Sequence, residues 1–253
     1  MVLLRAIYGE VLKVKRTLVM RLAFLAPLII VGFVFLVFLD GGDELWDDPP
    51  ENAWLELGKM VNILWALIVL PLFTTLQTAL LAGIEHDSEQ WKRLYALPVP
   101  RWCVYVAKQV VATGLMGLSH VGLVVASLVA GVLLWCLVPS AGFHAPVPWG
   151  RFLLPVGVAY LGSWLILAIH TWIGQRWKGF ALASAMGIVL TIAGMAVISS
   201  EWGSYYPWAL SGVLVNTLNK GEALPWRELV LGCGGGLLAT VLGAWEVTRR
   251  DVL

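Results

Sequence analysis

Six long apolar runs, separated by short polar segments, make up most of this chain. Each run is long enough for a helix to cross the ~30 Å hydrocarbon core of a bilayer, which takes about 20 residues. The runs cover residues 18–39, 57–84, 105–137, 152–175, 179–199 and 228–247. The pattern therefore predicts an all-α membrane protein with six transmembrane helices, in which residues 1–253 form a single transmembrane domain.

The composition agrees with a membrane protein. Hydrophobic residues make up 59% of the chain, charged residues make up 13%, and the mean hydropathy is +0.82. Soluble domains carry about 25% charged residues, so the composition argues against a water-soluble globule. The net charge of +1 indicates no nucleic-acid partner. The first run, residues 18–39, is longer than the apolar core of a cleavable signal peptide, so we expect it to be retained.

The positive charges indicate which side of the membrane each connecting segment faces, because Lys and Arg are enriched in cytoplasmic loops. If the N-terminus is cytoplasmic, four of the 17 Lys and Arg residues lie outside and the other 13 lie inside. The four outer residues are Lys59, Arg151, Lys220 and Arg227. We therefore predict that both termini are cytoplasmic, together with the polar segment between the second and third runs.

The segment before the first run has a helical pattern of its own. Apolar residues recur at helical spacing at Leu4, Ile7, Val11, Val14 and Leu18, while Arg5, Lys13 and Arg16 face elsewhere. This pattern favours a basic amphipathic helix that lies in the inner surface of the membrane. A plain extension of the first span is the alternative.

The segment between the fifth and sixth runs is too short and too polar to span a membrane. It contains the aromatic sequence Tyr205, Tyr206, Pro207 and Trp208, followed by several apolar residues. The aromatic density favours short re-entrant helices that dip back into the outer leaflet as part of an outer gate. Such a backbone has to be buried in protein or line a cavity. The alternative is a surface loop with one amphipathic turn.

The motifs of an enzyme are missing. The sequence contains neither the G-x-x-x-x-G-K-[ST] phosphate loop nor the H-E-x-x-H zinc motif, and no histidine follows Ser211 to complete a serine protease. His120 and His170 lie inside apolar runs, where hydrogen bonds between helices or a substrate contact explain them. The three cysteines have no metal-binding or disulfide spacing. We therefore predict no catalytic or metal site, and if ATP drives this protein, another chain binds the ATP.

Neutral polar residues form a stripe on the second span. Thr74, Gln77 and Thr78 share one helical face. Two interpretations fit the stripe equally well: hydrogen bonds between helices, or the lining of a pore. On the sixth span, Gly232 and Gly236 form a G-x-x-x-G pattern, which is typical of closely packed membrane helices.

The polar segment between the second and third runs predicts a short helix at about residues 87–97. Asp87 or Ser88 can cap its first turn, and Glu89 suits the positive end of the helix dipole. Trp91, Leu94 and Tyr95 fall on one face, and Pro98 ends the helix. The resulting amphipathic helix suits docking in the groove of a partner protein, or alternatively rests on the lipid surface.

Several sequence features together resemble the permease subunits of ABC-2-type transporters. They are EVLKVKRT before the first run, Glu85 at the end of the second, WKRLYALPVPRWCVYVAK after it, Tyr206-Pro207-Trp208 in the outer segment, and the closing Arg249-Arg250-Asp251-Val252. The resemblance covers essentially the whole chain. Within the family, the length and the hairpin sequence are most similar to the bacteriocin and lantibiotic immunity permeases.

The resemblance implies the type V exporter-like permease fold. In that fold an interfacial helix precedes the first of six spans, re-entrant helices lie on the outer side, and two subunits form the pore. It also implies that the helix near residues 87–97 is a coupling helix, docked on a cytosolic ATPase. The residues of this sequence that match the family pattern there are Glu85, Trp91, Leu94, Pro98, Arg101 and Lys108.

The function expected from this resemblance is that of the permease subunit of an ATP-driven exporter in the bacterial cytoplasmic membrane. ATP and Mg²⁺ would be bound by the partner ATPase, present in two copies per transporter. The other expected partners are membrane lipid and a second permease, either a copy of this chain or a paralogue. The expected cargo is a membrane-active peptide, or an amphipathic drug or lipid. The alternative is a non-transporting scaffold or sensor that docks a cytosolic regulator through residues 85–101.

Overall fold

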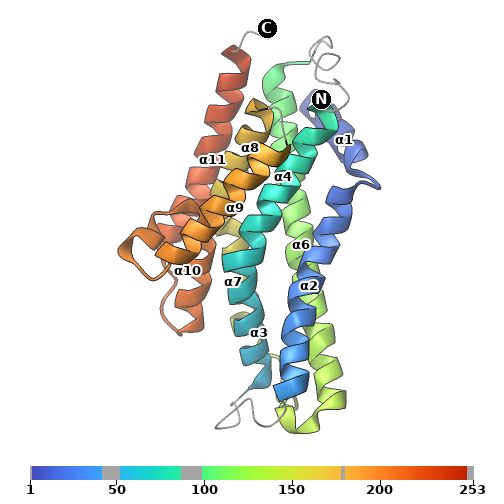
Figure 1. Ribbon diagram of the computed structural model, residues 1–253, viewed down its shortest axis with the longest axis vertical. Helices are drawn as coiled ribbons and strands as arrows, with labels where there is room; N and C mark the ends of the chain where they lie inside the picture. The colour runs from blue at the N-terminus through green and yellow to red at the C-terminus, as the bar shows by residue number, and fades with distance from the viewer. Residues whose placement is uncertain (1, 42–51, 87–98, 178–179, 250–253) are drawn as a thin grey trace.

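The computed structural model of the protein describes residues 2–41, 52–86, 99–177 and 180–249. The described residues form a helical bundle without β-strands, and most helices run along the long axis of the molecule (Figure 1). Six spans are long and apolar enough to cross a membrane: Leu18–Gly41, Ala53–Ile84, Arg101–Leu137, Trp149–Arg176, Phe180–Val197 and Trp226–Arg249. The prediction of six helical spans is confirmed. The largest differences in boundary are four residues, at Ala53 against 57 and at Arg101 against 105.

Two of the six spans are built from more than one helical piece. The helices are α1 (Val2–Val14), α2 (Leu18–Gly41), α3 (Ala53–Leu64), α4 (Leu70–His86), α6 (Arg101–Leu137), α7 (Trp149–Gly162), α8 (Trp164–Arg176), α9 (Phe180–Val197), α10 (Pro207–Asn219) and α11 (Trp226–Arg249). Short turns are η2 (Trp65–Val69), η3 (Pro139–Ala141) and η4 (Glu201–Ser204). The second span thus joins α3, η2 and α4, and the fourth joins α7 and α8.

A proline explains the irregular turn in the second span. Residues Trp65–Val69 form a π-helical turn, in which the N–H of Leu70 bonds to the carbonyl of Trp65. The next residue is Pro71, which has no N–H and whose ring crowds the preceding helical turn. A π-turn, with its wider i→i−5 bonding, accommodates that ring without ending the helix.

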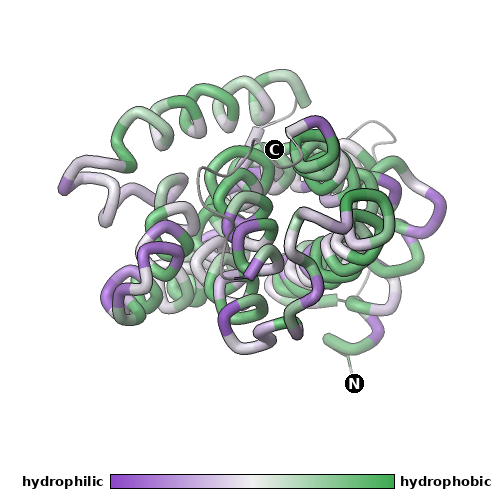
Figure 2. Tube along the Cα trace, turned by 90° about the horizontal axis from the view of Figure 1, so that it is seen from below, coloured by the Kyte–Doolittle hydropathy of each residue, from purple (hydrophilic) through white to green (hydrophobic). Residues whose placement is uncertain are grey.

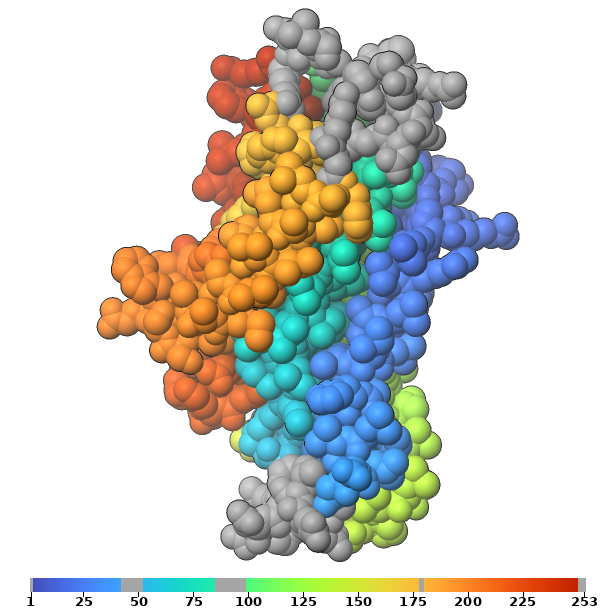
Figure 3. Space-filling model, in the orientation of Figure 1, coloured from blue at the N-terminus to red at the C-terminus, as the bar shows by residue number. Residues whose placement is uncertain are grey.

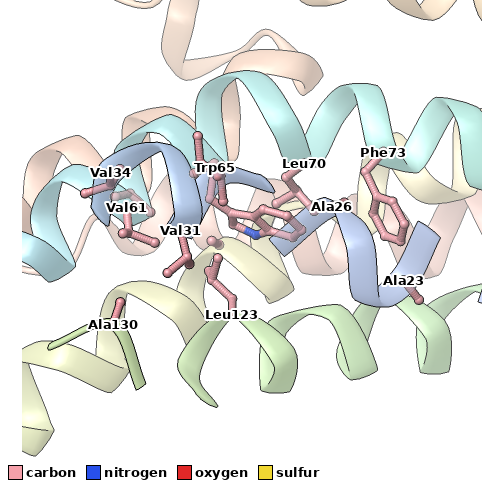
Figure 4. Packing of buried hydrophobic residues seen from close by; sticks show 14 of the residues in the cluster. Ala23, Ala26, Val31, Val34, Val61, Trp65, Leu70, Phe73, Leu123 and Ala130 are labelled. Carbon is pink, nitrogen blue, oxygen red and sulfur yellow. The ribbon is translucent and has the colours of Figure 1, made fainter. Parts of the chain in front are cut away.

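Trp65 lies at the centre of the core that holds α2, α3, α4 and α6 together. Its side chain is fully buried among Val31, Leu70 and Leu123 (Figure 4). The indole N–H donates to Nε2 of His120 on α6, at 3.2 Å. This contact supports the interpretation of His120 as a histidine that forms a hydrogen bond between helices.

One face of the bundle shows how α2, α4 and α9 are arranged. Figure 3 shows one face on which α9, α4 and α2 lie side by side, so that α4 has a neighbouring helix on each side. The helix α9 runs obliquely across this face, and its tilt is evident in Figures 1 and 2. Apolar residues are exposed on the outside of the bundle, including Phe33 on α2, Val121 on α6 and Val189 on α9. Hydrophobic residues also predominate along the helices in Figure 2. An apolar exterior fits a multi-pass membrane protein, since lipid tails replace water there.

The two ends of the bundle carry different elements. At one end lie α1, the end of α4, the start of α6, and the ends of α8 and α11 (Figure 1). We call this the hairpin end, because the segment between α4 and α6 connects there. At the opposite end lie the start of α3 and the ends of α2 and α6.

Candidate functional site

The predicted coupling residues divide between described and undescribed parts of the chain. Asp87, Glu89, Trp91, Leu94, Tyr95 and Pro98 lie outside the described residues. Glu85 belongs to the last turn of α4, and its side chain also lies outside the described residues. Arg101 begins α6, and Lys108 lies two turns further along. The described part of this site is therefore the place where the hairpin joins α4 and α6.

A buried ionic cluster lies next to that junction. It consists of Glu10 and Lys13 on α1 and Lys108 on α6, and we call it the Glu10 cluster. The Lys108 ammonium lies 3.3 Å from one carboxylate oxygen of Glu10, and the Lys13 ammonium lies 2.6 Å from the other. Glu10 and Lys108 are each only 7% exposed. A buried carboxylate shared by two cations holds α1 firmly against α6, because either charge alone would be costly to bury.

The junction between α1 and α2 explains why Glu10 can face α6. Arg16 has a left-handed backbone, with φ of 62°, which turns the chain between the two helices. The Thr17 hydroxyl donates to the carbonyl of Val14 at 2.7 Å and so caps the end of α1. The N-terminal segment is thus a separate helix, and the idea of a plain extension of the first span is wrong.

The face that α1 buries against the bundle matches only in part the apolar face that the sequence pattern predicted. Glu10 and Val14 are buried against the bundle, whereas Leu4 and Val11 are 71% and 42% exposed. Tyr8 is also exposed, so α1 has a second, unburied apolar face. That face suits contact with lipid, while the location of α1 in the membrane surface stays a prediction.

A second polar contact joins α8 and α11 at the same end. The Trp172 indole on α8 donates to the carboxylate of Glu246 on α11. The Arg176 guanidinium lies 4.0 Å from the other oxygen of Glu246. Nearby, Tyr105 of α6 packs so closely on Gly243 that an added Cβ would lie 2.1 Å from the phenol oxygen. The first turns of α6 are therefore held by α1 on one side and by α11 on another.

Two of the four predicted outer residues, Pro207 and Trp208, begin a helix that packs inside the bundle, and Tyr205 and Tyr206 directly precede it. Pro207 is the first residue of α10, where a missing N–H costs no hydrogen bond. Trp208 is buried and donates to Nε2 of His170 at 3.1 Å, and Tyr206 donates to the carbonyl of Leu190 at 3.0 Å. Tyr205 is 57% exposed. The segment is thus not a surface loop, but whether it re-enters the membrane stays a prediction.

The polar stripe on the second span is buried within the chain. The hydroxyls of Thr74 and Thr78 donate to carbonyls of their own helix, at 2.8 Å in both cases. The Gln77 amide donates to the carbonyl of Ala112 on α6 at 2.7 Å. Hydrogen bonding between helices therefore accounts for Gln77. A pore-lining role for the stripe stays a prediction, because the pore expected for this family forms between two subunits.

The close packing predicted for the glycines of the sixth span is confirmed. A Cβ on Gly232 would lie 2.5 Å from the carbonyl oxygen of Gly162, at the junction of α7 and α8. A Cβ on Gly236 would lie 2.6 Å from the backbone of Trp164. The absence of side chains on these two glycines lets α11 touch the fourth span backbone to backbone.

Sequence reasoning missed Glu10 and Glu246 as contributors to this end of the bundle. Both are acids close to the end of an apolar helix, and Glu10 lies one turn before Val14 on what became the buried face of α1. An acid on the buried face of a helix indicates a cationic partner on another helix. The sequence had already drawn attention to that cation, Lys108 of the third span. Among the described residues no group of three or more His, Cys, Asp or Glu could hold a metal ion.

Comparison with known proteins gives one match. A family model described as ABC-2 family transporter protein matches residues 6–194, which run from α1 into the last turns of α9. No curated protein matches the chain. No solved structure matches it either.

Proposed function

Because this chain belongs to the ABC-2 family of transporter proteins, we propose that it is the permease subunit of an ATP-driven exporter. Membership of the family implies a membrane location and an ATPase partner. The sequence contains no phosphate-binding loop of its own. In our proposal two cytosolic ATPase subunits bind ATP and Mg²⁺, and this chain pairs with a second permease to enclose the transport path.

The observation that carries the proposal is the Glu10 cluster beside the hairpin. Residues 87–100 connect α4 to α6, and Lys108 lies seven residues after the start of α6, or about 10 Å along the helix. A force applied to the hairpin would act on α4 and α6, which it joins. The buried Glu10–Lys108 contact and the Tyr105–Gly243 contact would then pass the displacement to α1 and α11.

The proposed mechanism is a rigid-body tilt. Closure of the ATPase subunits moves the coupling helix, in which Trp91, Leu94 and Tyr95 form the docking face. The movement tilts the second and third spans, which the hairpin joins. Because α10 is tied to the second span by a bond from the Ser211 hydroxyl to the carbonyl of Ala66, at 3.0 Å, the tilt also reaches the opposite end.

Loss of ATPase binding tests the proposal. The double change Trp91→Asp and Leu94→Asp places two charges on the docking face and should release the ATPase when the tagged full-length chain is purified from its own host. The matched control is Trp202→Asp, because Trp202 is 76% exposed and follows α9, far from the hairpin. Unchanged ATPase recovery with the hairpin variant would refute the docking role, and no ATPase with either chain would favour a non-transporting scaffold.

For the cargo, we propose a membrane-active peptide of the bacteriocin or lantibiotic class, exported from the bacterial cytoplasmic membrane. The support is the likeness of the hairpin sequence to immunity permeases and the apolar, nearly uncharged spans. Expression of the chain with its co-purifying ATPase should raise the concentration of such a peptide needed to stop growth of a sensitive bacterium. The hairpin variant should give no protection, and equal sensitivity with and without the native pair would rule out this cargo.

A further inference from the structure

A cavity of about 240 Å³ lies between three elements toward the end of the bundle opposite the hairpin. Its walls come from the first turns of α3, the first turns of α7 and the end of α10. Both α3 and α7 start spans at this end. The cavity therefore lies close to a membrane boundary, where lipid headgroups meet the protein.

The walls of the cavity are fixed by specific contacts. Gly58 lets the Phe152 ring pack closely on α3, since a Cβ there would lie 3.0 Å from the ring. The Asn219 amide donates to the carbonyl of Lys59 at 3.1 Å and joins α10 to α3. Gly221, with φ of 77°, ends α10 in a left-handed turn that sets Glu222 on the wall. Contacts from all three elements thus fix the shape of the cavity.

Asn62 gives the cavity a polar group that lacks a partner. The residue is only 5% exposed and lines the cavity. Its side-chain amide forms no hydrogen bond with any described residue, and its polar atoms are not among the fully buried ones that lack a partner, so solvent in the cavity reaches them. A ligand with hydrogen-bonding groups can take the place of that solvent.

The charges around the cavity favour an anion attached to an apolar body. Arg151 lines the cavity and forms no ion pair with the described acids, whereas Lys59 is paired with Glu56 at 2.6 Å. A guanidinium binds the oxygens of a phosphate in a forked arrangement. Apolar side chains, including Phe152, supply the rest of the wall. Glu222 can accept a hydrogen bond from a hydroxyl or amine on the same ligand.

We propose that this cavity binds the phosphodiester headgroup of a phospholipid from the membrane leaflet at this end of the bundle. Arg151 contacts the phosphate, and the Asn62 amide donates to a phosphate or ester oxygen. Glu222 accepts from the hydroxyl or amine of the headgroup. The site goes beyond the transport function, because it requires neither ATP nor a particular cargo.

The test measures binding of a fluorescent phosphatidylglycerol to the purified full-length chain in detergent micelles. Arg151→Gln and Asn62→Leu should each weaken binding about tenfold or more, since each removes a hydrogen bond to the headgroup. Lys220→Gln is the matched control, because Lys220 precedes Gly221 but does not line the cavity. Asn62→Leu should also leave the unfolding temperature without lipid unchanged or higher, which separates lost binding from misfolding.

Two further arms identify the source of the phosphate. A fluorescent diacylglycerol with the same acyl chains should bind at least about tenfold more weakly, because it lacks the phosphate. Displacement of the lipid by millimolar inorganic phosphate would assign the site to free phosphate, and resistance to it would support the lipid headgroup. Equal affinity of wild type, Arg151→Gln and Asn62→Leu, or equal affinity for diacylglycerol, would overturn the proposal. Loss of ATPase docking in the hairpin variant should leave this binding intact.

Discussion

Replacing Glu10 with glutamine removes the carboxylate that two lysines share, while keeping the shape of the side chain. The Glu10 and Lys108 side chains are 9% and 8% exposed, so solvent screens their contact weakly. Removal of one partner from a buried ion pair costs about 3–5 kcal/mol. We expect the lower end, about 3 kcal/mol of unfolding free energy, because the Lys13 side chain is 23% exposed and can turn toward water.

The reverse change, Lys108→Met, should cost less. Glu10 would keep its 2.6 Å contact with Lys13, and methionine preserves the apolar packing of the lysine stem. The loss is then that of one charge-assisted hydrogen bond, about 1.5–3 kcal/mol. The two changes remove the same contact, so the double variant should be more stable than their sum predicts by about 1–2 kcal/mol.

Unfolding in mixed micelles with increasing sodium dodecyl sulfate, followed by tryptophan fluorescence, measures these differences; the chain carries 14 tryptophans. Glu56→Gln is the matched control, since its contact with Lys59 has the same 2.6 Å length and the same helical spacing as the Glu10–Lys13 contact. That pair is more exposed, at 37% for lysine and 29% for glutamate, and should contribute below about 1 kcal/mol. Equal losses for Glu10→Gln and Glu56→Gln, or strictly additive double-variant energies, would refute a structural role for the Glu10 cluster.

Three other predictions use different contacts. Gly232→Ala forces a methyl group into the backbone of the fourth span and should cost about 1–3 kcal/mol, whereas Gly234→Ala, with its nearest neighbour 3.9 Å away, should be neutral or stabilising in the same unfolding assay. Trp208→Phe removes the indole donor to the histidine of α8 and should cost about 0.5–1.5 kcal/mol, while Trp202→Phe at a 76% exposed position should change stability little; equal effects would contradict the buried hydrogen bond. A cysteine at Asp47, with the native cysteines changed to serine, should react with an impermeant maleimide added outside cells, and labelling only after lysis would overturn the predicted orientation.

The spans were predictable from the sequence because membrane insertion depends on local properties. A run of about 20 apolar residues is readable without knowledge of its neighbours. The N-terminal helix was also predicted, since its apolar spacing is a local signal. The π-turn at Trp65–Val69 was missed, although Pro71 inside an apolar run was its visible cause.

The site was predictable only in part. Lys108 was identified from the family pattern, but its partner Glu10 was not, because the two are 98 residues apart. The polar stripe was recognised on the second span, yet the sequence left open which helix Gln77 meets. The contact with Ala112 depends on how the second and third spans rotate about their axes. No short motif specifies that rotation.

The sequence alone determined the all-helical class, the number and limits of the spans and the family resemblance, since each rests on local hydropathy or on short motifs. The tertiary structure decided which helices touch. It buried Glu10 between two lysines, seated α11 on the fourth span through Gly232, and closed a cavity around Asn62 from three elements. The physical reason is that helix rotation, tilt and close approach are set by packing over the whole bundle. The apolar period of a single helix leaves those choices open.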